Sequence, residues 1–182
     1  MTSIRRAIAL LAMTMVVLFA TDARTQAAQL KIVAIGASNT SGLGVGAAAA
    51  YPAQLQMLLR KRGIDANVIN AGVSGDVTAG MLKRLDASVP KGTDIVILQP
   101  GANDLRFFGT KERRAANIAA MVNRLRARGI RVIVYDPPKI PPDFYQWDGI
   151  HFNAAAHAKI AATLAAQIAG ERKAQPNSEP KP

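Results

Sequence analysis

The stretch DGIHFN, residues 148–153, places an aspartate three positions before a histidine. A carboxylate at this spacing can hold an imidazole in the tautomer that general-base catalysis requires. The second of the two histidines, His157, falls within a helical pattern, and we interpret it as a structural or surface residue. Two histidines without matching carboxylates do not form a metal site, and a chain without cysteine has no thiol nucleophile or disulfide. The sequence therefore favours acid–base chemistry at Asp148 and His151, with no metal.

Three other segments supply polar groups that such chemistry could use. Ser38, in IGASNTSGLG, is either a nucleophile or only a helix N-cap. Gly75, in NAGVSGD, either turns a backbone N–H toward a ligand or forms an ordinary turn. Asn103, in PGANDLR, either donates from its side-chain amide or stabilises its own loop. For each residue taken alone, the structural interpretation is the simpler one.

These segments follow the ends of predicted strands. Apolar runs predict four strands, at residues 30–36, 65–72, 93–101 and 131–136. Helical patterns start at Tyr51, span 77–89, centre on 118–125 and follow Asn153, which can cap the last helix. Alternating strands and helices predict an α/β fold with a parallel, doubly wound, flavodoxin-like sheet. Ligands of such sheets bind at the carboxyl ends of the strands, where the polar segments meet.

In this order, the four segments resemble the sequence blocks of the SGNH (GDSL-type) hydrolases, particularly their lysophospholipase/thioesterase-like bacterial branch. The resemblance covers about residues 30 to 170 and implies a three-layer α/β/α fold. It also implies a serine esterase that cleaves carboxylic ester or thioester bonds through an acyl-enzyme, without a cofactor. By this resemblance Ser38 is the nucleophile, His151 the base and Asp148 the acid. The oxyanion hole would comprise Ser38, Gly75 and Asn103.

Two features depart from the family pattern. Ala37 precedes the serine, where the family usually has aspartate, and only PPKIPPDFYQW lies between the fourth strand and Asp148. The branch usually has a further helix and a fifth strand in that interval. We therefore expect a short sheet of four or five strands, with a proline-stiffened link positioning the acid–base loop. Neither departure removes a triad residue, so both concern efficiency and substrate shape more than reaction type.

Apolar and aromatic residues flank the candidate site. We predict that they line an acyl or aryl pocket, although they could equally cover the end of the sheet. The predicted pocket residues are Leu105, Phe107, Phe108, Tyr145 and Trp147. Short-chain or aryl esters, lysophospholipids, acyl thioesters and acetylated sugars all remain possible substrates, because fold-level analogy does not choose among them.

Two other function classes compete with a serine esterase. GLGVGA, residues 42–47, fits a dinucleotide-binding glycine pattern, but it starts too far after the first strand, and Asp65 stands at the beginning of the second strand rather than its end. The second competing class is a non-catalytic, ligand-binding relative of the esterases that has lost activity through Ala37. Within the enzymes, a carbohydrate O-acetyl esterase is an alternative to an esterase of acyl substrates.

The N-terminal segment resembles a secretory signal. A basic stretch, MTSIRR, precedes an apolar run of 14 residues and then small residues near Ala27. We therefore expect residues 1–27 to be a cleaved signal peptide and the protein to be periplasmic or secreted; an uncleaved membrane anchor is the alternative. We expect residues 28–170 to form the hydrolase domain and 171–182 a disordered tail.

The chain is strongly basic, and its charge bears on its partners. Its net charge is +11, and losing three arginines and one aspartate with residues 1–27 leaves +9. This charge would allow peripheral contact with anionic membrane or envelope surfaces. No aromatic-interleaved basic motif points to nucleic acid. The expected partner is a small-molecule or lipid ester.

Overall fold

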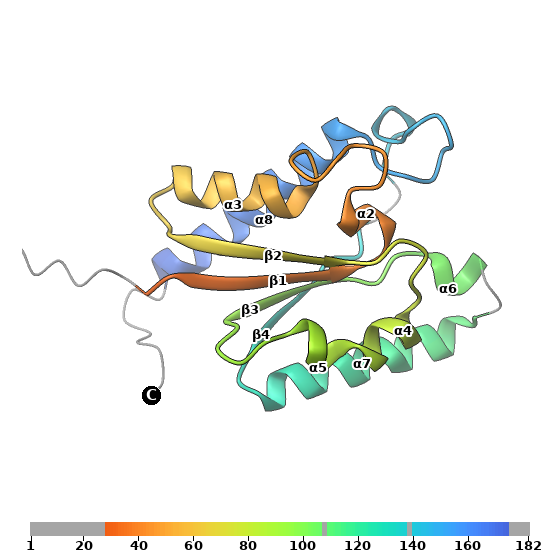
Figure 1. Ribbon diagram of the computed structural model, residues 1–182, viewed down its shortest axis with the longest axis horizontal. Helices are drawn as coiled ribbons and strands as arrows, with labels where there is room; N and C mark the ends of the chain where they lie inside the picture. The colour runs from red at the N-terminus through yellow and green to blue at the C-terminus, as the bar shows by residue number, and fades with distance from the viewer. Residues whose placement is uncertain (1–27, 107–108, 138–139, 175–182) are drawn as a thin grey trace, which may run out of the picture.

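The computed structural model describes residues 28–106, 109–137 and 140–174. Its centre is a sheet of four parallel strands in the order β2-β1-β3-β4 (Figure 1). The strands are β1 (Leu30–Gly36), β2 (Ala66–Gly72), β3 (Ile95–Gln99) and β4 (Arg131–Val134). This arrangement confirms the predicted α/β class and the short sheet, and the described residues between β4 and Asp148 contribute no further strand.

Helices cover both faces of the sheet because the side chains of β1 alternate between two apolar clusters. Ile32 and Ala34 pack on the side of α3 (Tyr51–Lys61) and α8 (Ala154–Ala174). Val33 and Ile35 pack on the opposite side. That side is covered by α4 (Thr78–Lys83), α5 (Leu85–Ser88) and α7 (Lys111–Ala127). Figure 1 shows the resulting three layers, with the sheet edge-on between the two sets of helices.

The carboxyl ends of the strands meet at one edge of the sheet. Gly36 of β1 pairs with Gly72 of β2 and with Gln99 of β3. Two four-residue helices begin just beyond this edge, α2 (Ser38–Ser41) after β1 and α6 (Asn103–Arg106) after β3. A 3-10 turn, η1 (Pro142–Phe144), lies in the link that precedes Asp148. The fold thus places all the polar segments singled out in the sequence at one edge.

The structure differs from the predicted elements at several of their ends. β3 and β4 are shorter than the strands predicted at 93–101 and 131–136, and two helical segments also differ. The predicted helix at 77–89 is two short helices, α4 and α5, separated at Arg84. The disordered tail was predicted to begin at residue 171, but α8 continues to Ala174. Glu171 is held there by a hydrogen bond from Gln167 and an ion pair with Arg131. Residues 1–27 and 175–182 lie outside the described part of the chain, and none of the described helices could span a membrane.

His157 is a structural residue, as predicted. Its side chain is fully buried, and its Nδ1 accepts a hydrogen bond of 3.1 Å from the Tyr51 N–H at the start of α3. The two rings stack, with centroids 6.4 Å apart. Burial without a charged partner lowers the pKa of His157 to about 4, so the ring is neutral at physiological pH. It joins α8 to α3 and takes no part in the sheet-edge site.

Candidate active site

Ser38 lies on a tight turn between β1 and α2. A side chain at Gly36 would collide with Thr40 Oγ1 and would come within 2.8 Å of the Gln99 carbonyl oxygen, so the turn requires glycine there. Thr40 Oγ1 and Gln99 Oε1 form a buried hydrogen bond of 2.6 Å, which joins α2 to the end of β3. Ser38 is only 8% exposed. Its position is therefore fixed by the sheet edge and not by a mobile loop.

Asp148 and His151 form a directly bonded pair. Asp148 Oδ2 lies 2.5 Å from His151 Nδ1, and Asp148 Oδ1 accepts hydrogen bonds of 2.9 Å from the N–H groups of Ile150 and His151. These hydrogen bonds, that from the His151 N–H above all, lower the pKa of Asp148 to about 2. The carboxylate is therefore ionised at neutral pH, so His151 Nδ1 carries the proton and Nε2 is free to accept one.

The acid–base loop is bonded to the serine turn. Asn39 Oδ1 accepts a hydrogen bond of 2.9 Å from the Phe152 N–H, 113 positions away in the sequence. Gln146 Nε2 donates to the carbonyl oxygens of Leu43, at 2.7 Å, and Phe152, at 2.9 Å. The first of these bonds connects the immediate neighbours of Ser38 and His151, and the bonds of Gln146 connect the same two loops. The structure contains no hydrogen bond between Ser38 and His151 themselves; in enzymes such bonds often tighten only when substrate binds.

A hydrogen bond joins Asn103 to the loop that carries Gly75. Gly75 adopts a φ of +81° in a turn closed by the Asp76 N–H and the Val73 carbonyl, and no described residue accepts a bond from its N–H. Asn103 Nδ2 donates to the Asp76 carbonyl oxygen at 2.8 Å. The second N–H of this amide remains available to a ligand. The Gly75 loop and α6 are thus joined beside the serine turn.

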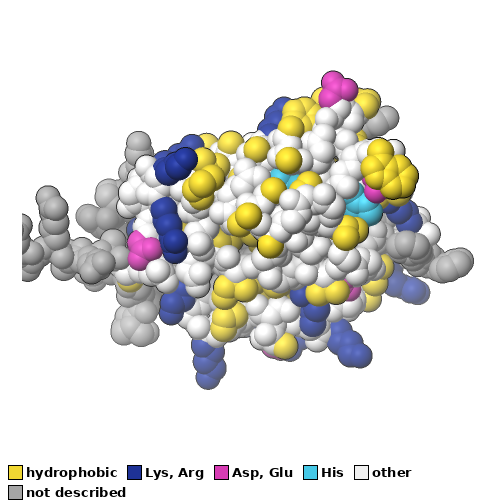
Figure 2. Space-filling view, turned by 45° about the horizontal axis from the view of Figure 1, so that its top comes forward, with side chains coloured by type: hydrophobic (Ala, Val, Ile, Leu, Met, Phe, Trp, Pro, Cys, Tyr) yellow, Lys and Arg dark blue, Asp and Glu magenta, His cyan; other side chains and the backbone are white. Residues whose placement is uncertain are grey.

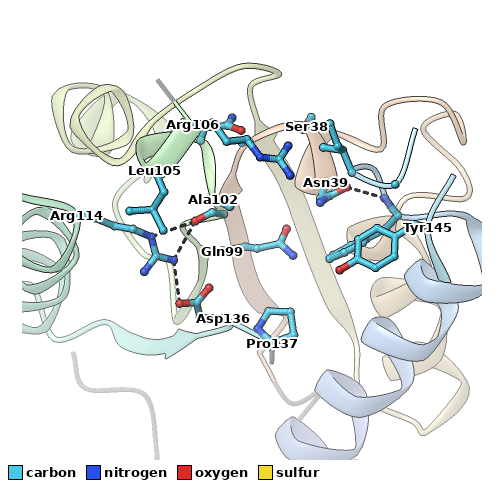
Figure 3. A pocket seen from close by; sticks show the side chains of 16 residues that line it. Ser38, Asn39, Gln99, Ala102, Leu105, Arg106, Arg114, Asp136, Pro137 and Tyr145 are labelled. Atoms are coloured by element: carbon cyan, nitrogen blue, oxygen red, sulfur yellow. Dashed lines mark hydrogen bonds and ion pairs between the residues drawn. The ribbon is translucent and has the colours of Figure 1, made fainter. Parts of the chain in front are cut away.

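A cavity of about 360 Å³ opens at this edge of the sheet (Figure 3). Ser38, Asn39 and Asn103 line it, together with the predicted pocket residues Leu105 and Tyr145. Gly75, Asp148 and His151 do not belong to its wall, although the neighbours of His151, Ile150 and Phe152, do. Ser38 therefore faces a cavity in which a substrate could reach it.

None of the other predicted pocket residues is among the described residues that line the cavity. Trp147 is 97% exposed and is not part of the cavity wall, so its predicted place in the pocket does not hold in this structure. A hydrogen bond between the Gln146 N–H and the His151 carbonyl closes the loop at its base and leaves Trp147 at the outer turn. Phe107 and Phe108 lie outside the described residues.

The sequence analysis missed the residues that connect these segments. Asn39 and Gln146 join the two loops, and Arg84 lies under the strand ends. Asn39 directly follows the candidate nucleophile, which is a usable signal. Gln146 and Arg84 offer no such signal, because their partners are backbone carbonyls and a carboxylate that only the fold brings near.

The glycine-rich segment does not form a dinucleotide site in this fold. Gly42, Gly44 and Gly46 lie in successive turns between α2 and α3 rather than between β1 and its first helix. Asp65 precedes β2 at the opposite edge of the sheet, where it accepts hydrogen bonds from Gln29 Nε2. A ribose held by Asp65 would therefore be a whole strand length away from the carboxyl ends.

Residues 34–175 match the model of the GDSL-like lipase/acylhydrolase family. The chain belongs to this family. It is 32% identical, over 142 residues, to Esterase TesA of Pseudomonas aeruginosa, an alignment that covers 75% of this chain and 70% of that protein. Family membership identifies an ester-hydrolysing enzyme whose substrate is a small-molecule ester, and it confirms the resemblance stated from the sequence.

Solved structures of similar proteins support the GDSL-like fold. A crystal structure of TesA superimposes with a TM-score of 0.67 at 24% identity, covering 74% of this chain and 95% of that one. The esterase EstA from Pseudoalteromonas sp., in a structure inhibited by monoethylphosphonate, gives 0.67 at 21% identity, covering 79% and 98%. AlinE4, an SGNH-hydrolase family esterase, gives 0.56 at 29% identity, covering 77% and 72%.

Ala37 occupies the position where this GDSL-like family usually has aspartate. It is 6% exposed and belongs to the apolar cluster that includes Met81 and Leu85. Its carbonyl oxygen accepts hydrogen bonds from the N–H groups of Thr40 and Ser41, at 3.1 and 3.0 Å. The serine turn is thus closed by the main chain of residue 37, and this closure does not need a side-chain carboxylate there.

Proposed function

We propose that Ser38, His151 and Asp148 form the catalytic triad of this ester hydrolase. The observation that carries the proposal is the 2.5 Å contact between Asp148 and His151, on a loop whose next residue is bonded to Asn39 beside Ser38. An ionised carboxylate on Nδ1 leaves Nε2 as the acceptor, which is the tautomer that a general base needs.

In the proposed reaction, His151 Nε2 takes the hydroxyl proton of Ser38 while Ser38 Oγ attacks the carbonyl carbon of the ester or thioester. The tetrahedral intermediate collapses when His151 gives that proton to the leaving alcohol or thiol. Water then attacks the acyl-enzyme, losing a proton to His151, and the acid is released as Ser38 regains its proton. Asp148 stays ionised throughout and stabilises the imidazolium form of His151.

The negative charge on the tetrahedral intermediate needs donors, and three are proposed. They are the backbone N–H groups of Ser38 and Gly75 and the side-chain amide of Asn103. Gly75 N–H has no acceptor among the described residues, and the Asn103 amide has one N–H beyond its bond to Asp76. Donors that are already held in place stabilise the oxyanion without reorganising during the reaction.

The cavity supports an acyl or aryl ester of small to moderate size. Its volume of about 360 Å³ lies near the lower end of usual ligand sites, which begin at roughly 300 Å³. Leu105, Tyr145, Ile150 and Phe152 give it an apolar part beside Ser38. Hydrolysis of aryl esters of increasing acyl length, run beside a lysophospholipid, an acyl thioester and acetylated sugars, would identify the substrate class.

Labelling by a fluorophosphonate tests the triad directly. The wild-type protein should form one covalent adduct at Ser38, and Ser38→Ala should form none and hydrolyse no ester. Thr163→Ala is the matched control, because it removes an exposed hydroxyl on α8 that bonds only to the Lys159 carbonyl. Labelling at another residue, or ester hydrolysis by Ser38→Ala, would refute the assignment. A wild-type protein that binds esters without labelling or turnover would support the non-catalytic alternative.

We further propose that the protein is exported and acts in the periplasm or outside the cell. The support is the sequence of residues 1–27, with its basic start, apolar run and small residues. Mass spectrometry of the purified protein should find a mature N-terminus near residue 28. A mature chain that still begins at Met1 or Thr2 would contradict cleavage.

Peripheral contact with an anionic lipid surface is proposed on two observations. The net charge is strongly positive, and Figure 2 shows Lys and Arg side chains projecting from several places on one face of the molecule. Trp147 is 97% exposed beside Asp148, as a residue that inserts at a membrane interface would be. Trp147 is the only tryptophan of the chain, so its fluorescence reports on this loop alone. Vesicles rich in phosphatidylglycerol should shift its emission to the blue, and vesicles of phosphatidylcholine should not. An unchanged emission with both would refute the contact.

A further inference from the structure

The cavity beside Ser38 contains charges that ester hydrolysis itself does not require. Three charged side chains line it, those of Arg106, Arg114 and Asp136. Arg114 and Asp136 form an ion pair at 2.8 Å, and Arg114 also donates two hydrogen bonds to the Gly101 carbonyl. Arg106 forms no ion pair or hydrogen bond with any residue that the structure describes. The described wall therefore has one positive charge without a counter-charge.

Arg106 is placed where a ligand of Ser38 would meet it. It is the last residue of α6, the helix that begins with the proposed oxyanion donor Asn103. Figure 3 shows its side chain extending into the cavity toward Ser38 and Asn39, whereas that of Arg114 turns to Asp136. Arg106 is also exposed, so its guanidinium is hydrated until a ligand replaces the water.

We propose that Arg106 forms an anion subsite and that the preferred substrates are esters carrying a carboxylate, sulfonate or phosphate group close to the scissile bond. The proposal rests on the proposed function of Ser38. A guanidinium presents its N–H donors in a fixed fork that matches the oxygens of these groups. A neutral ester in the same cavity leaves this charge without a partner. Arg106 should therefore favour anionic esters over neutral ones.

The simpler interpretation is that Arg106 is a solvated cation near the carbonyl end of a short helix. That interpretation explains a basic residue at this position, but it predicts no influence on which ester is cleaved. The two interpretations therefore differ in a measurable ratio, namely kcat/KM for an anionic ester divided by kcat/KM for a neutral ester of nearly equal size.

Two pairs of esters measure this ratio with the charge on either side of the scissile bond. Mono-4-nitrophenyl adipate and its methyl ester differ in a carboxylate on the acyl side. 4-Acetoxybenzenesulfonate and 4-acetoxybenzenesulfonamide differ in a sulfonate on the alcohol side. The wild-type enzyme should favour the anionic member of one pair, which shows the side on which the subsite lies.

Arg106→Gln removes the charge while keeping a polar side chain, and Arg106→Lys keeps the charge. Loss of a hydrogen bond to a charged group should lower the anionic-to-neutral ratio by about tenfold in Arg106→Gln. Arg106→Lys should restore part of it. Arg126→Gln is the matched control, because it removes the same charge from an exposed position on α7 outside the cavity wall and should leave the ratio unchanged.

Equal ratios for wild type and Arg106→Gln in both pairs, or an equal fall in Arg126→Gln, would overturn the subsite. These outcomes are separate from a failure of the proposed function, which would appear as ester hydrolysis by Ser38→Ala. Calorimetric titration of 4-hydroxybenzenesulfonate and adipate into Ser38→Ala provides a readout without turnover. Binding of one of them that is lost in the Ser38→Ala, Arg106→Gln double variant supports the subsite, and no binding of either counts against it.

Discussion

Arg84 lies under the carboxyl ends of two strands and contacts the loop that carries Gly75. Its guanidinium donates to the carbonyl oxygens of Ala71 at 2.8 Å and Gly36 at 3.1 Å, and it pairs with Asp76 at 2.8 Å. Asp76 in turn follows Gly75, and its carbonyl oxygen holds the Asn103 amide. One side chain thus supports both the serine turn and the proposed oxyanion donors.

Replacing Arg84 by methionine should destabilise the fold. The change keeps much of the side-chain volume but leaves two carbonyl oxygens and the Asp76 carboxylate without this partner. The Arg84 and Asp76 side chains are 22% and 11% exposed, so water compensates for only part of the loss. We expect the free energy of unfolding to fall by about 2–4 kcal/mol. For a protein of this size that corresponds to a Tm lower by roughly 4–16 °C, measurable by circular dichroism.

The same substitution should slow the reaction more than it weakens substrate binding. A displaced Asp76 moves both the Gly75 N–H and the partner of Asn103, and a misplaced oxyanion donor acts on the transition state alone. Complete loss of one donor costs about 100- to 1,000-fold in kcat, so partial misplacement should cost roughly 10- to 100-fold with little change in KM. Arg84→Lys should recover part of both losses, because an ammonium can satisfy some of the acceptors but not all of them.

Arg128 provides a matched control for this reasoning. It also joins a helix to a carbonyl oxygen, that of Val89 at 2.7 Å, and its side chain is 28% exposed, but it lies away from the cavity wall. Arg128→Met should therefore lower Tm without changing kcat, when both are measured well below Tm. If Arg84→Met loses stability but keeps the wild-type kcat, Arg84 is a structural residue only, and its positioning role is refuted.

Three further predictions follow from the site and its surroundings. Asn103→Ala should lower kcat by roughly 100- to 1,000-fold, and wild-type turnover in a kinetic assay would refute its role as an oxyanion donor. Asp148→Asn should lower kcat by about 10⁴-fold. The Tm of the wild type should exceed that of Asp148→Asn near neutral pH, and this difference should shrink as the pH falls from about 4 to 2, because the folded protein stabilises only the ionised form of Asp148. Burial lowers the pKa of His157 from 6.5 to about 4, so as the pH falls this histidine is protonated in the unfolded chain before it is protonated in the folded one. The free energy of unfolding should therefore fall by up to about 3 kcal/mol between pH 6.5 and 4. His157→Asn keeps an acceptor for the Tyr51 N–H and should flatten this decline in a thermal-unfolding series; an equally steep decline would exclude His157 as its cause.

The central strands were predictable because burial on both faces of the sheet requires a nearly continuous run of apolar residues. Residues 30–36 and 95–99 are central in the sheet, and their nearly unbroken apolar runs cannot form an exposed strand. The position of Ser38, Gly75 and Asn103 at one edge then follows from parallel pairing. Helix ends were less predictable: α8 continues past residue 170 because alanine-rich sequence and the contacts of Glu171 extend it, and a distant arginine supplies one of those contacts.

The direction of individual side chains could not be predicted from the sequence. Trp147 closely follows Phe144 and Tyr145, which pack against the apolar core. Trp147 nevertheless faces solvent, because the turn is closed beneath it. The bond between Asn39 and the Phe152 N–H depends on two segments at opposite ends of the domain. Neither result follows from local periodicity, since both depend on how the loops meet above the finished sheet.

Ala37 shows how the site can keep its geometry without the family's usual aspartate. An aspartate before the serine would have to be buried among Met81, Leu85 and their neighbours, where an ionised carboxylate needs hydrogen-bond partners. In this chain three features that involve no side chain at residue 37 shape the turn, namely the close approach at Gly36, the buried Thr40–Gln99 bond and the main-chain bonds to the Ala37 carbonyl. The aspartate is therefore not needed to hold Ser38 at the sheet edge. The replacement changes the polarity of one buried position next to the proposed nucleophile. The ion pair between Arg84 and Asp76 then holds the loop that carries the proposed oxyanion donor Gly75.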